Sequence, residues 1–184
     1  MTVVINLFGG SGLGKSTTAA LIFGEMKLQG KHCELVREFV KEWAWEGRKI
    51  QPGDQKIIFD NQLAREKIYY NKLDYIVTDS PLVLGPIYQK FYTGKDSIAD
   101  DVFNTLKTNE QNGVVYMNFL LKRNKPFDPR GRYETEEQAR EVDDYVEAYL
   151  KNKSIPFHTV MSDDRERVHE IIEKVIQRGN NTAS

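Results

Sequence analysis

The stretch that decides the fold lies at residues 3–30, which read VVINLFGGSGLGKSTTAALIFGEMKLQG. Its first six residues, Val3 to Phe8, are largely apolar and rich in β-branched side chains, a pattern typical of a strand. Residues 16–29 have a helical composition and are followed by Gly30, a common helix stop. A glycine-rich loop separates the two segments. The stretch therefore predicts a strand, a loop and a helix in direct succession.

The loop matches the pattern G-x-x-x-x-G-K-[ST] through Gly9, Gly14, Lys15 and Ser16, in the strand-to-helix setting that the pattern requires. Glycines let the backbone turn its N–H groups toward a phosphate, and the start of the helix adds a positive end. Lys15 can reach the β- and γ-phosphates, Ser16 can ligate Mg²⁺, and Thr17 is expected at the α-phosphate. We expect ATP and Mg²⁺ as cofactors, bound by Gly9, Gly10, Ser11, Gly12, Leu13, Gly14, Lys15, Ser16 and Thr17.

The rest of the chain alternates between short apolar runs and longer segments with helical spacing of apolar residues. We expect strands at residues 33–36, 75–78, 114–121 and 157–161, and helices at residues 39–47, 54–72, 135–150 and 163–178. Residues 86–112 are polar and aromatic with weak periodicity, and we expect them to shape an acceptor pocket. The alternation predicts an α/β, three-layer P-loop NTPase fold, in which helices cover both faces of a five-stranded parallel sheet.

Length and composition favour one domain. A chain of 184 residues with 40% apolar content can bury one core, and we expect a single P-loop kinase domain over residues 1–178 and a flexible tail over residues 179–184. The net charge of −1 gives no general attraction to nucleic acid or to anionic membranes. Cys33 has no second cysteine to pair with, and the N-terminal apolar run is too short for export or for a membrane span. We therefore expect a cytoplasmic protein without a membrane partner, whose oligomeric state the sequence does not indicate.

Asp79 directly follows the third expected strand. Ligands bind at the carboxyl ends of strands in parallel sheets, so this acid can hold Mg²⁺ or orient an attacking hydroxyl. The alternative is that Asp79 only caps the turn at Ser80 and Pro81. Residues 77–80 contain no second acid, which a hydrolytic motor would be expected to show.

Arg37 and Glu38 follow the second expected strand, which places a cation and a carboxylate beside the P-loop. Glu38 can accept the proton of an attacking hydroxyl and Arg37 can bind an anionic part of the acceptor, unless the two form a plain surface ion pair. Phe39 and Trp43 lie one helical turn apart and either stack on a flat base or belong to the core. We expect these four residues to bind the acceptor, with Glu38 or Asp79 as the base.

Between the fourth expected strand and the next helix, five cations lie within eleven residues, interrupted by prolines and a glycine: Lys122, Arg123, Lys125, Arg130 and Arg132. Such a segment is either a solvated basic loop or a kinase lid over about residues 122–133. A lid closes guanidinium groups over the γ-phosphate and excludes water. We therefore expect an Arg-rich lid, with Arg123, Arg130 and Arg132 acting in catalysis together with Lys15.

Together these segments resemble the ribosylnicotinamide kinase domain of bifunctional regulators of NAD synthesis, within a wider group of small P-loop nucleoside and nucleotide kinases often classed with AAA-type ATPases. The matching segments are residues 9–16, 37–40, 78–79, 120–122 and 128–132. In that family the third strand tends to end in two acids around a Thr, whereas Val77 replaces the first acid here. Deoxynucleoside kinases are similar in carrying a Glu and a nearby Trp after strand two, as Glu38 and Trp43 do, but their Asp-Arg-Ser piece is absent at residues 79–81.

The sequence and the resemblance thus predict an ATP-dependent phosphotransferase that moves the γ-phosphoryl group to a hydroxyl or phosphate of a nucleoside or nucleotide acceptor. In this prediction Ser16 and Asp79 hold the metal. Two alternatives stay open. One is a kinase acting on a modified base or an end within nucleic acid, although the net charge does not indicate this partner. The other is an ATPase or nucleotide switch module.

Overall fold

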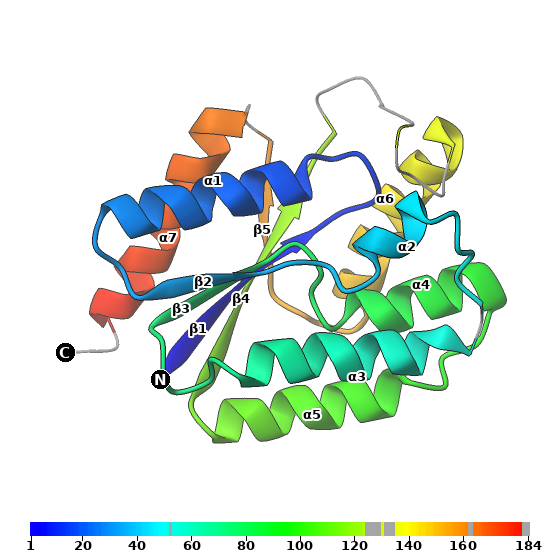
Figure 1. Ribbon diagram of the computed structural model, residues 1–184, viewed down its shortest axis with the longest axis horizontal. Coiled ribbons are helices and arrows are strands. Elements are labelled where there is room, and N and C mark those ends of the chain that lie inside the picture. Colours follow the sequence, from blue (N-terminus) through cyan, green and yellow to red (C-terminus); the bar gives the residue numbers. More distant parts are fainter. Residues whose placement is uncertain (52, 124–129, 131–134, 162–163, 182–184) are drawn as a thin grey trace.

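The computed structural model describes residues 1–51, 53–123, 130, 135–161 and 164–181. Its strands are β1 (Thr2–Phe8), β2 (Cys33–Val36), β3 (Tyr75–Thr78), β4 (Val114–Leu121) and β5 (His158–Val160). They form one sheet in the order β2-β3-β1-β4-β5, and every neighbouring pair is parallel (Figure 1). The predicted five-stranded parallel sheet is confirmed, with each strand within a residue or two of its expected place.

β1 lies at the centre of the sheet, and all of its residues are buried. In the register of the sheet, Ile5 is level with Val77 of β3 on one side and with Met117 of β4 on the other. After β1 the chain forms β2 and β3 on one side of it, and it then crosses over to form β4 and β5 on the other side. The direction in which strands are added therefore reverses at β1. Loops at such a point open into the crevice where α/β sheets bind ligands.

Helices cover both faces of the sheet, as predicted (Figure 1). On one face, α1 (Lys15–Leu28) and α7 (Asp164–Asn181) pack their buried apolar residues against Val3, Ile5 and Leu7. On the other face, an apolar cluster around Phe8 and Leu120 joins the sheet to four helices. These are α3 (Asp54–Lys67), α4 (Leu84–Thr93), α5 (Ala99–Gln111) and α6 (Glu136–Asn152).

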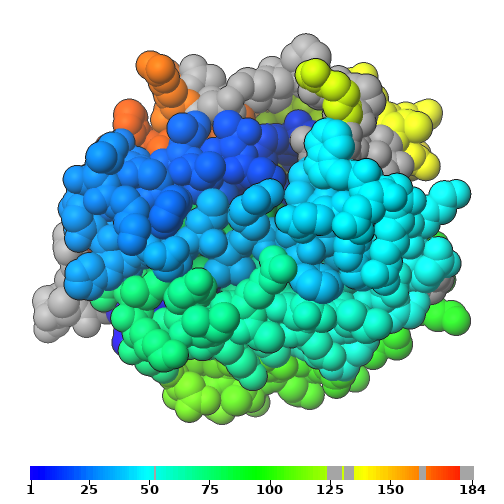
Figure 2. Space-filling model, in the orientation of Figure 1, coloured from blue at the N-terminus to red at the C-terminus, as the bar shows by residue number. Residues whose placement is uncertain are grey.

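A short helix, α2 (Lys41–Trp45), follows β2 and carries no buried residue. Figure 2 shows the segment from α2 to the start of α3, in cyan, on the same face of the molecule as α1, in blue. This segment therefore forms a wall beside the start of α1, and it contributes several residues to the cavity described below.

Residues 86–112, whose periodicity is weak in the sequence, lie mostly in two helices in the structure. In α4 the apolar residues Leu84, Ile87, Tyr88 and Phe91 recur at helical spacing, and Gly94 with φ 70° ends the helix. α5 continues the same layer. Aromatic side chains in α4 and polar and charged side chains in α5 make the two segments look irregular in composition, although their apolar spacing is helical.

Two helix ends also differ from expectation. α3 ends at Lys67 rather than near residue 72, because the chain turns at Asn71, which has φ 58° and whose backbone N–H donates to Thr2 Oγ1 at 2.8 Å. α7 continues to Asn181, three residues into the segment expected to be a tail, and residues 182–184 lie outside the described part. No helix in the described part of the chain is long and apolar enough to cross a membrane.

Candidate nucleotide and acceptor site

The loop between β1 and α1 has the backbone shape of an anion cradle. Gly12 and Gly14 have φ of 78° and 82°, whereas Leu13 between them has no positive φ. Left-handed residues are favourable for glycine, and their alternation with right-handed ones turns successive N–H groups to one concave side. α1 begins at Lys15, so its positive end faces the same place.

The ammonium group of Lys15 is held by the loop itself. Its Nζ donates to the carbonyl oxygens of Gly9 at 2.7 Å and Gly10 at 2.8 Å, and the side chain borders the main cavity. The backbone of the loop therefore holds the Lys15 ammonium beside the cradle.

Helix α6 touches the start of the loop through Asp143. Oδ1 of Asp143 accepts a 2.7 Å hydrogen bond from the Gly10 N–H, and Oδ2 accepts one from Arg123 Nε at 2.8 Å. A Cβ on Gly10 would lie 2.5 Å from this carboxylate and 2.7 Å from the Ala139 carbonyl oxygen, so only glycine fits here. Burial raises the pKa of Asp143, and Arg123 is the main cause that opposes this rise.

Two arginines hold the outer side of the loop. Arg123 Nη2 donates to the Ser11 carbonyl oxygen at 2.9 Å, and Arg167 Nη1 of α7 donates to the Leu13 carbonyl oxygen at 3.1 Å. The side chain of Arg123 is only 8% exposed and Arg167 is completely buried. A guanidinium is rarely buried to this extent unless hydrogen bonds compensate its desolvation.

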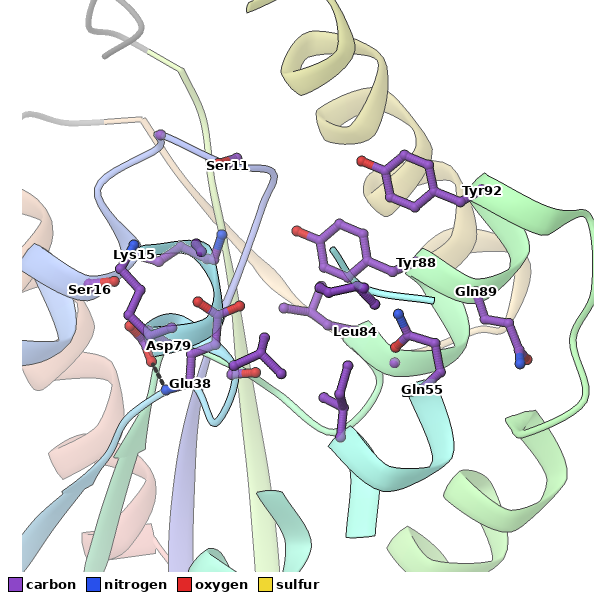
Figure 3. A pocket seen from close by; sticks show the side chains of 18 of the residues that line it. Ser11, Lys15, Ser16, Glu38, Gln55, Asp79, Leu84, Tyr88, Gln89 and Tyr92 are labelled. Carbon is purple, nitrogen blue, oxygen red and sulfur yellow. Dashed lines mark hydrogen bonds between the residues drawn. The ribbon is translucent and has the colours of Figure 1, made fainter. Parts of the chain in front are cut away.

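Glu38 and Asp79 lie together across from the loop. The Glu38 N–H donates to Asp79 Oδ1 at 2.9 Å, and the next backbone N–H, of Phe39, donates to Gln62 Oε1 at 3.1 Å. Gln62 also donates to Thr78 Oγ1 at 3.4 Å, at the end of β3. The segment after β2 is thereby fixed to the end of β3, and both carboxylates face the cavity (Figure 3).

One cavity of about 490 Å³ connects these groups, within the range of typical small-molecule sites. Figure 3 shows its two ends: Lys15, Ser16, Glu38 and Asp79 gather at one, and side chains from α3 and α4 at the other. The second end is lined mainly by Ile58, Leu84, Tyr88, Tyr92, Gln55 and Gln89. The cavity is therefore charged where a triphosphate would lie and largely apolar and aromatic farther away.

Gln55 is one of two amides at the largely apolar end of the cavity. It is 8% exposed, and its amide makes no hydrogen bond within the described residues. Gln89, on the same cavity, donates to Ser97 Oγ at 3.0 Å and accepts from the Ile98 N–H at 3.2 Å. Because Gln55 borders the cavity, its amide can donate to and accept from a bound ligand.

The structure brings most of the predicted site residues into this cavity and leaves others outside it. The cavity is bordered by Ser11, Gly12, Gly14, Lys15, Ser16, Thr17, Glu38 and Asp79. Gly9, Gly10 and Leu13 shape the loop without bordering the cavity. Arg123 faces Asp143 and the Ser11 carbonyl instead of the cavity.

Three residues expected to bind the acceptor also lie outside the cavity lining. Arg37 is exposed, and Phe39 and Trp43 pack edge to face with ring centroids 5.6 Å apart. The Arg48 guanidinium lies 3.3 Å from the centroid of the Trp43 ring. Among the described residues, Trp43 thus stacks on an arginine of its own chain.

The predicted lid at residues 122–133 lies mostly outside the described residues, and so does Arg132. Arg130 is described, and it is exposed and does not border the cavity.

Sequence reasoning missed Asp143, Arg167 and Gln55, and it expected residues 86–112 at the acceptor pocket without singling out Tyr88 or Tyr92. The helical spacing of apolar residues in α4 could have placed Tyr88 on a helix. No local pattern marks Asp143 or Arg167, because each meets the loop from more than 130 residues away along the chain.

The residues present suit a bound Mg²⁺. In the described part of the chain, no cluster of three or more His, Cys, Asp or Glu side chains could hold a metal alone. Mg²⁺ in phosphate sites usually takes one or two protein oxygens and completes its shell with phosphates and waters. The Ser16 hydroxyl and the Asp79 carboxylate border the same cavity and supply such oxygens.

Residues 71–74 match the Asn-Lys-x-Asp pattern of guanine-binding proteins. They precede β3, and in a parallel sheet the amino end of β3 is the end opposite the P-loop at the carboxyl end of β1. This segment is therefore too far from the phosphate loop to recognise the guanine base of a nucleotide bound there.

Comparison with known proteins places the chain in a family. The family model described as AAA domain matches residues 4–175. The chain belongs to this family. Among solved structures, the AAA domain described here is similar to deoxyadenosine kinase from M. mycoides with bound dATP, at 20% identity and a TM-score of 0.60, over 94% of this chain and 98% of that one. It is also similar to NadR in complex with NR, at 14% identity and a TM-score of 0.70, over 96% of this chain and 51% of that one.

At these identities the likeness concerns the fold, and it confirms the expected α/β P-loop fold and the resemblance to small P-loop nucleoside kinases. No curated protein matched the chain.

Proposed function

We propose that this AAA domain is an ATP-dependent phosphotransferase that moves the γ-phosphoryl group of ATP to a hydroxyl or phosphate of a nucleoside or nucleotide. One observation carries the proposal: a single cavity joins the phosphate cradle, two carboxylates and an apolar, aromatic end. Donor and acceptor therefore have room to meet in line, which is where much of the rate of phosphoryl transfer originates.

On the donor side, the Gly12 and Gly14 N–H groups and Lys15 bind the phosphates, and Ser16 and Asp79 hold Mg²⁺. A bound Mg²⁺ would neutralise charge that develops on the transferring group. On the acceptor side, Glu38 or Asp79 accepts the proton of the attacking hydroxyl. Both carboxylates are candidates because both border the cavity beside Lys15.

The apolar end suits a flat ring. Leu84 and Tyr88 provide apolar and aromatic surface, and the Gln55 amide adds a polar partner. Pockets for small cofactors and bases commonly combine such a lining with a few directed polar groups. The similarity to a deoxyadenosine kinase supports a nucleoside-like acceptor.

The decisive experiment incubates the protein with γ-labelled ATP, Mg²⁺ and a panel of nucleosides, nucleotides and oligonucleotides, with Lys15→Ala as the blank. The proposal expects label on a free nucleoside or nucleotide and loss of that label in Lys15→Ala. Labelled acceptor that persists in Lys15→Ala contradicts the proposed site. Label on oligonucleotides only, with affinity that falls steeply as salt rises, supports the nucleic-acid alternative. Free phosphate released at a rate that no acceptor changes supports an ATPase or switch.

A further inference from the structure

The carbonyl groups of Ser11 and Leu13 in the phosphate loop are each held by an arginine from a distant segment. Arg123, just after β4, binds the first at 2.9 Å, and Arg167, on α7, binds the second at 3.1 Å. Neither arginine borders the cavity. Their contact with the site is therefore made through the backbone of the loop.

The geometry of the peptide unit gives these contacts a consequence. The carbonyl of Ser11 and the N–H of Gly12 belong to one peptide unit, and so do the carbonyl of Leu13 and the N–H of Gly14. In a trans unit the two groups point in opposite directions, and the described chain has no cis peptide. An arginine that holds the carbonyl on the outer side thus turns the N–H to the inner side, where Gly12 and Gly14 border the cavity.

The burial of both guanidinium groups argues for a specific role. Arg167 is completely buried. The neighbouring buried residues of α7 that pack with α1 are apolar, such as Val168 and Ile171. Arg123 is nearly buried and is paired with Asp143 at 2.8 Å. Buried charges are costly, and an apolar side chain of similar volume often serves packing equally well or better. Packing alone does not account for two buried arginines that both end on loop carbonyls.

The Gly10 N–H is held differently from those of Gly12 and Gly14. It donates to Asp143 at 2.7 Å, so the protein itself occupies this amide. Asp143 thus anchors the beginning of the loop, and the same carboxylate anchors Arg123. The concave surface available to phosphate begins after this anchor and contains the two amides that the arginines orient.

We propose that Arg123 and Arg167 are positioning residues of the phosphate loop, which hold the Gly12 and Gly14 N–H groups toward the cavity before a nucleotide arrives. This inference rests on the proposed function, because it concerns the same phosphate site. A loop that is held in its binding shape loses little conformational freedom on binding, which strengthens affinity. Arg123 then acts from behind the loop instead of from a lid.

The test compares Arg123→Met, Arg123→Lys, Arg167→Met and Arg167→Lys with the unchanged protein. The dissociation constant of Mg·ADP is measured by calorimetry at a temperature where thermal melts show each variant folded. We expect the Met variants to bind about tenfold more weakly or worse, and the Lys variants, which keep a cation but not the planar fork, to recover part of the affinity. In phosphoryl transfer, KM for ATP rises while kcat at saturating ATP changes by less than about threefold, because the loop binds the phosphates in ground and transition state alike.

Two exposed arginines serve as matched controls: Arg165→Met on α7 and Arg140→Met on α6 leave nucleotide affinity unchanged. Folded Met variants that bind Mg·ADP as tightly as the unchanged protein overturn the inference alone. If Arg167→Met does not fold, Arg167→Lys carries the test, and unchanged affinity in that variant has the same meaning. Failure of the unchanged protein to bind Mg·ADP overturns the proposed function and the inference with it.

Discussion

The backbone N–H of Glu38 donates a 2.9 Å hydrogen bond to Oδ1 of Asp79, so the segment after β2 and the end of β3 form one unit. The two carboxylates that compete for the role of base are therefore structurally linked. A substitution that removes this bond disturbs both residues at once. Variants that keep it are needed to separate their roles.

Asp79→Asn keeps an oxygen that can accept from the Glu38 N–H but removes the charge that we propose holds Mg²⁺. We expect kcat for phosphoryl transfer to fall by about a hundredfold or more, and the Mg²⁺ concentration for half-maximal rate to rise. Asp79→Ala also loses the hydrogen bond, so its melting temperature falls in addition. Asp74→Asn, at an exposed position just before β3, is the control, and activity that is equally reduced there would contradict a specific role for Asp79.

Glu38→Gln leaves the backbone contact to Asp79 in place and removes one candidate base. If Glu38 accepts the proton, kcat falls by about a hundredfold to ten-thousandfold with little change in KM for ATP. Steady-state kinetics with the best acceptor measure this, and Glu42→Gln, on exposed α2, provides the comparison. A Glu38→Gln variant with normal kcat assigns the role of base to Asp79.

Gln55→Leu removes the only amide at the apolar end that lacks a hydrogen bond within the described residues. We expect KM for the acceptor to rise by about tenfold while KM for ATP stays constant, because the lost hydrogen bond belongs to the acceptor. Folding stability is retained, since no internal bond is broken. Gln89→Leu breaks the bonds to Ser97 and Ile98 and should lower the melting temperature instead. A Gln55→Leu variant whose KM for ATP rises while its KM for the acceptor stays constant would place the acceptor elsewhere.

Glu66 is completely buried, accepts a 2.8 Å hydrogen bond from Tyr70, and has its pKa raised by this burial to about 8 from an ordinary 4.5. The folded protein thus keeps a proton that the unfolded chain loses, so the free energy of unfolding falls as the pH rises between these two values. The slope is at most about 1.4 kcal/mol per pH unit. Glu66→Gln, which imitates the protonated acid, flattens the profile in urea unfolding, whereas exposed Glu141→Gln does not. An unchanged slope in Glu66→Gln would exclude this residue as its source.

The sheet and the phosphate loop were predictable because local signals determine them. Val3 to Phe8 is buried on both faces and apolar except at Asn6, as suits a central parallel strand, and the glycines that follow serve the left-handed backbone found at Gly12 and Gly14. The placement of Asp79 and Glu38 at the cavity follows from the rule that parallel strands present their carboxyl ends to a ligand.

The supports of the loop were not predictable, since they depend on contacts between distant parts of the chain. Arg123 is one of several basic residues in a polar stretch, and composition favoured a lid. In the structure its guanidinium faces Asp143 and the Ser11 carbonyl, a pairing set by how α6 packs over the sheet. The position of Trp43 was not predictable either, because its partner Arg48 lies in an irregular segment after α2 that sequence spacing does not orient.

The central position of β1 has a consequence for how nucleotide binding affects the whole molecule. Because β1 is paired on both sides and buried on both faces, its amide hydrogens exchange with solvent only when the entire sheet opens. A ligand held at the end of this strand therefore opposes global opening rather than a local fluctuation. Saturating nucleotide is expected to slow exchange throughout the core and to raise the melting temperature in one cooperative step, by an amount set by its concentration relative to Kd.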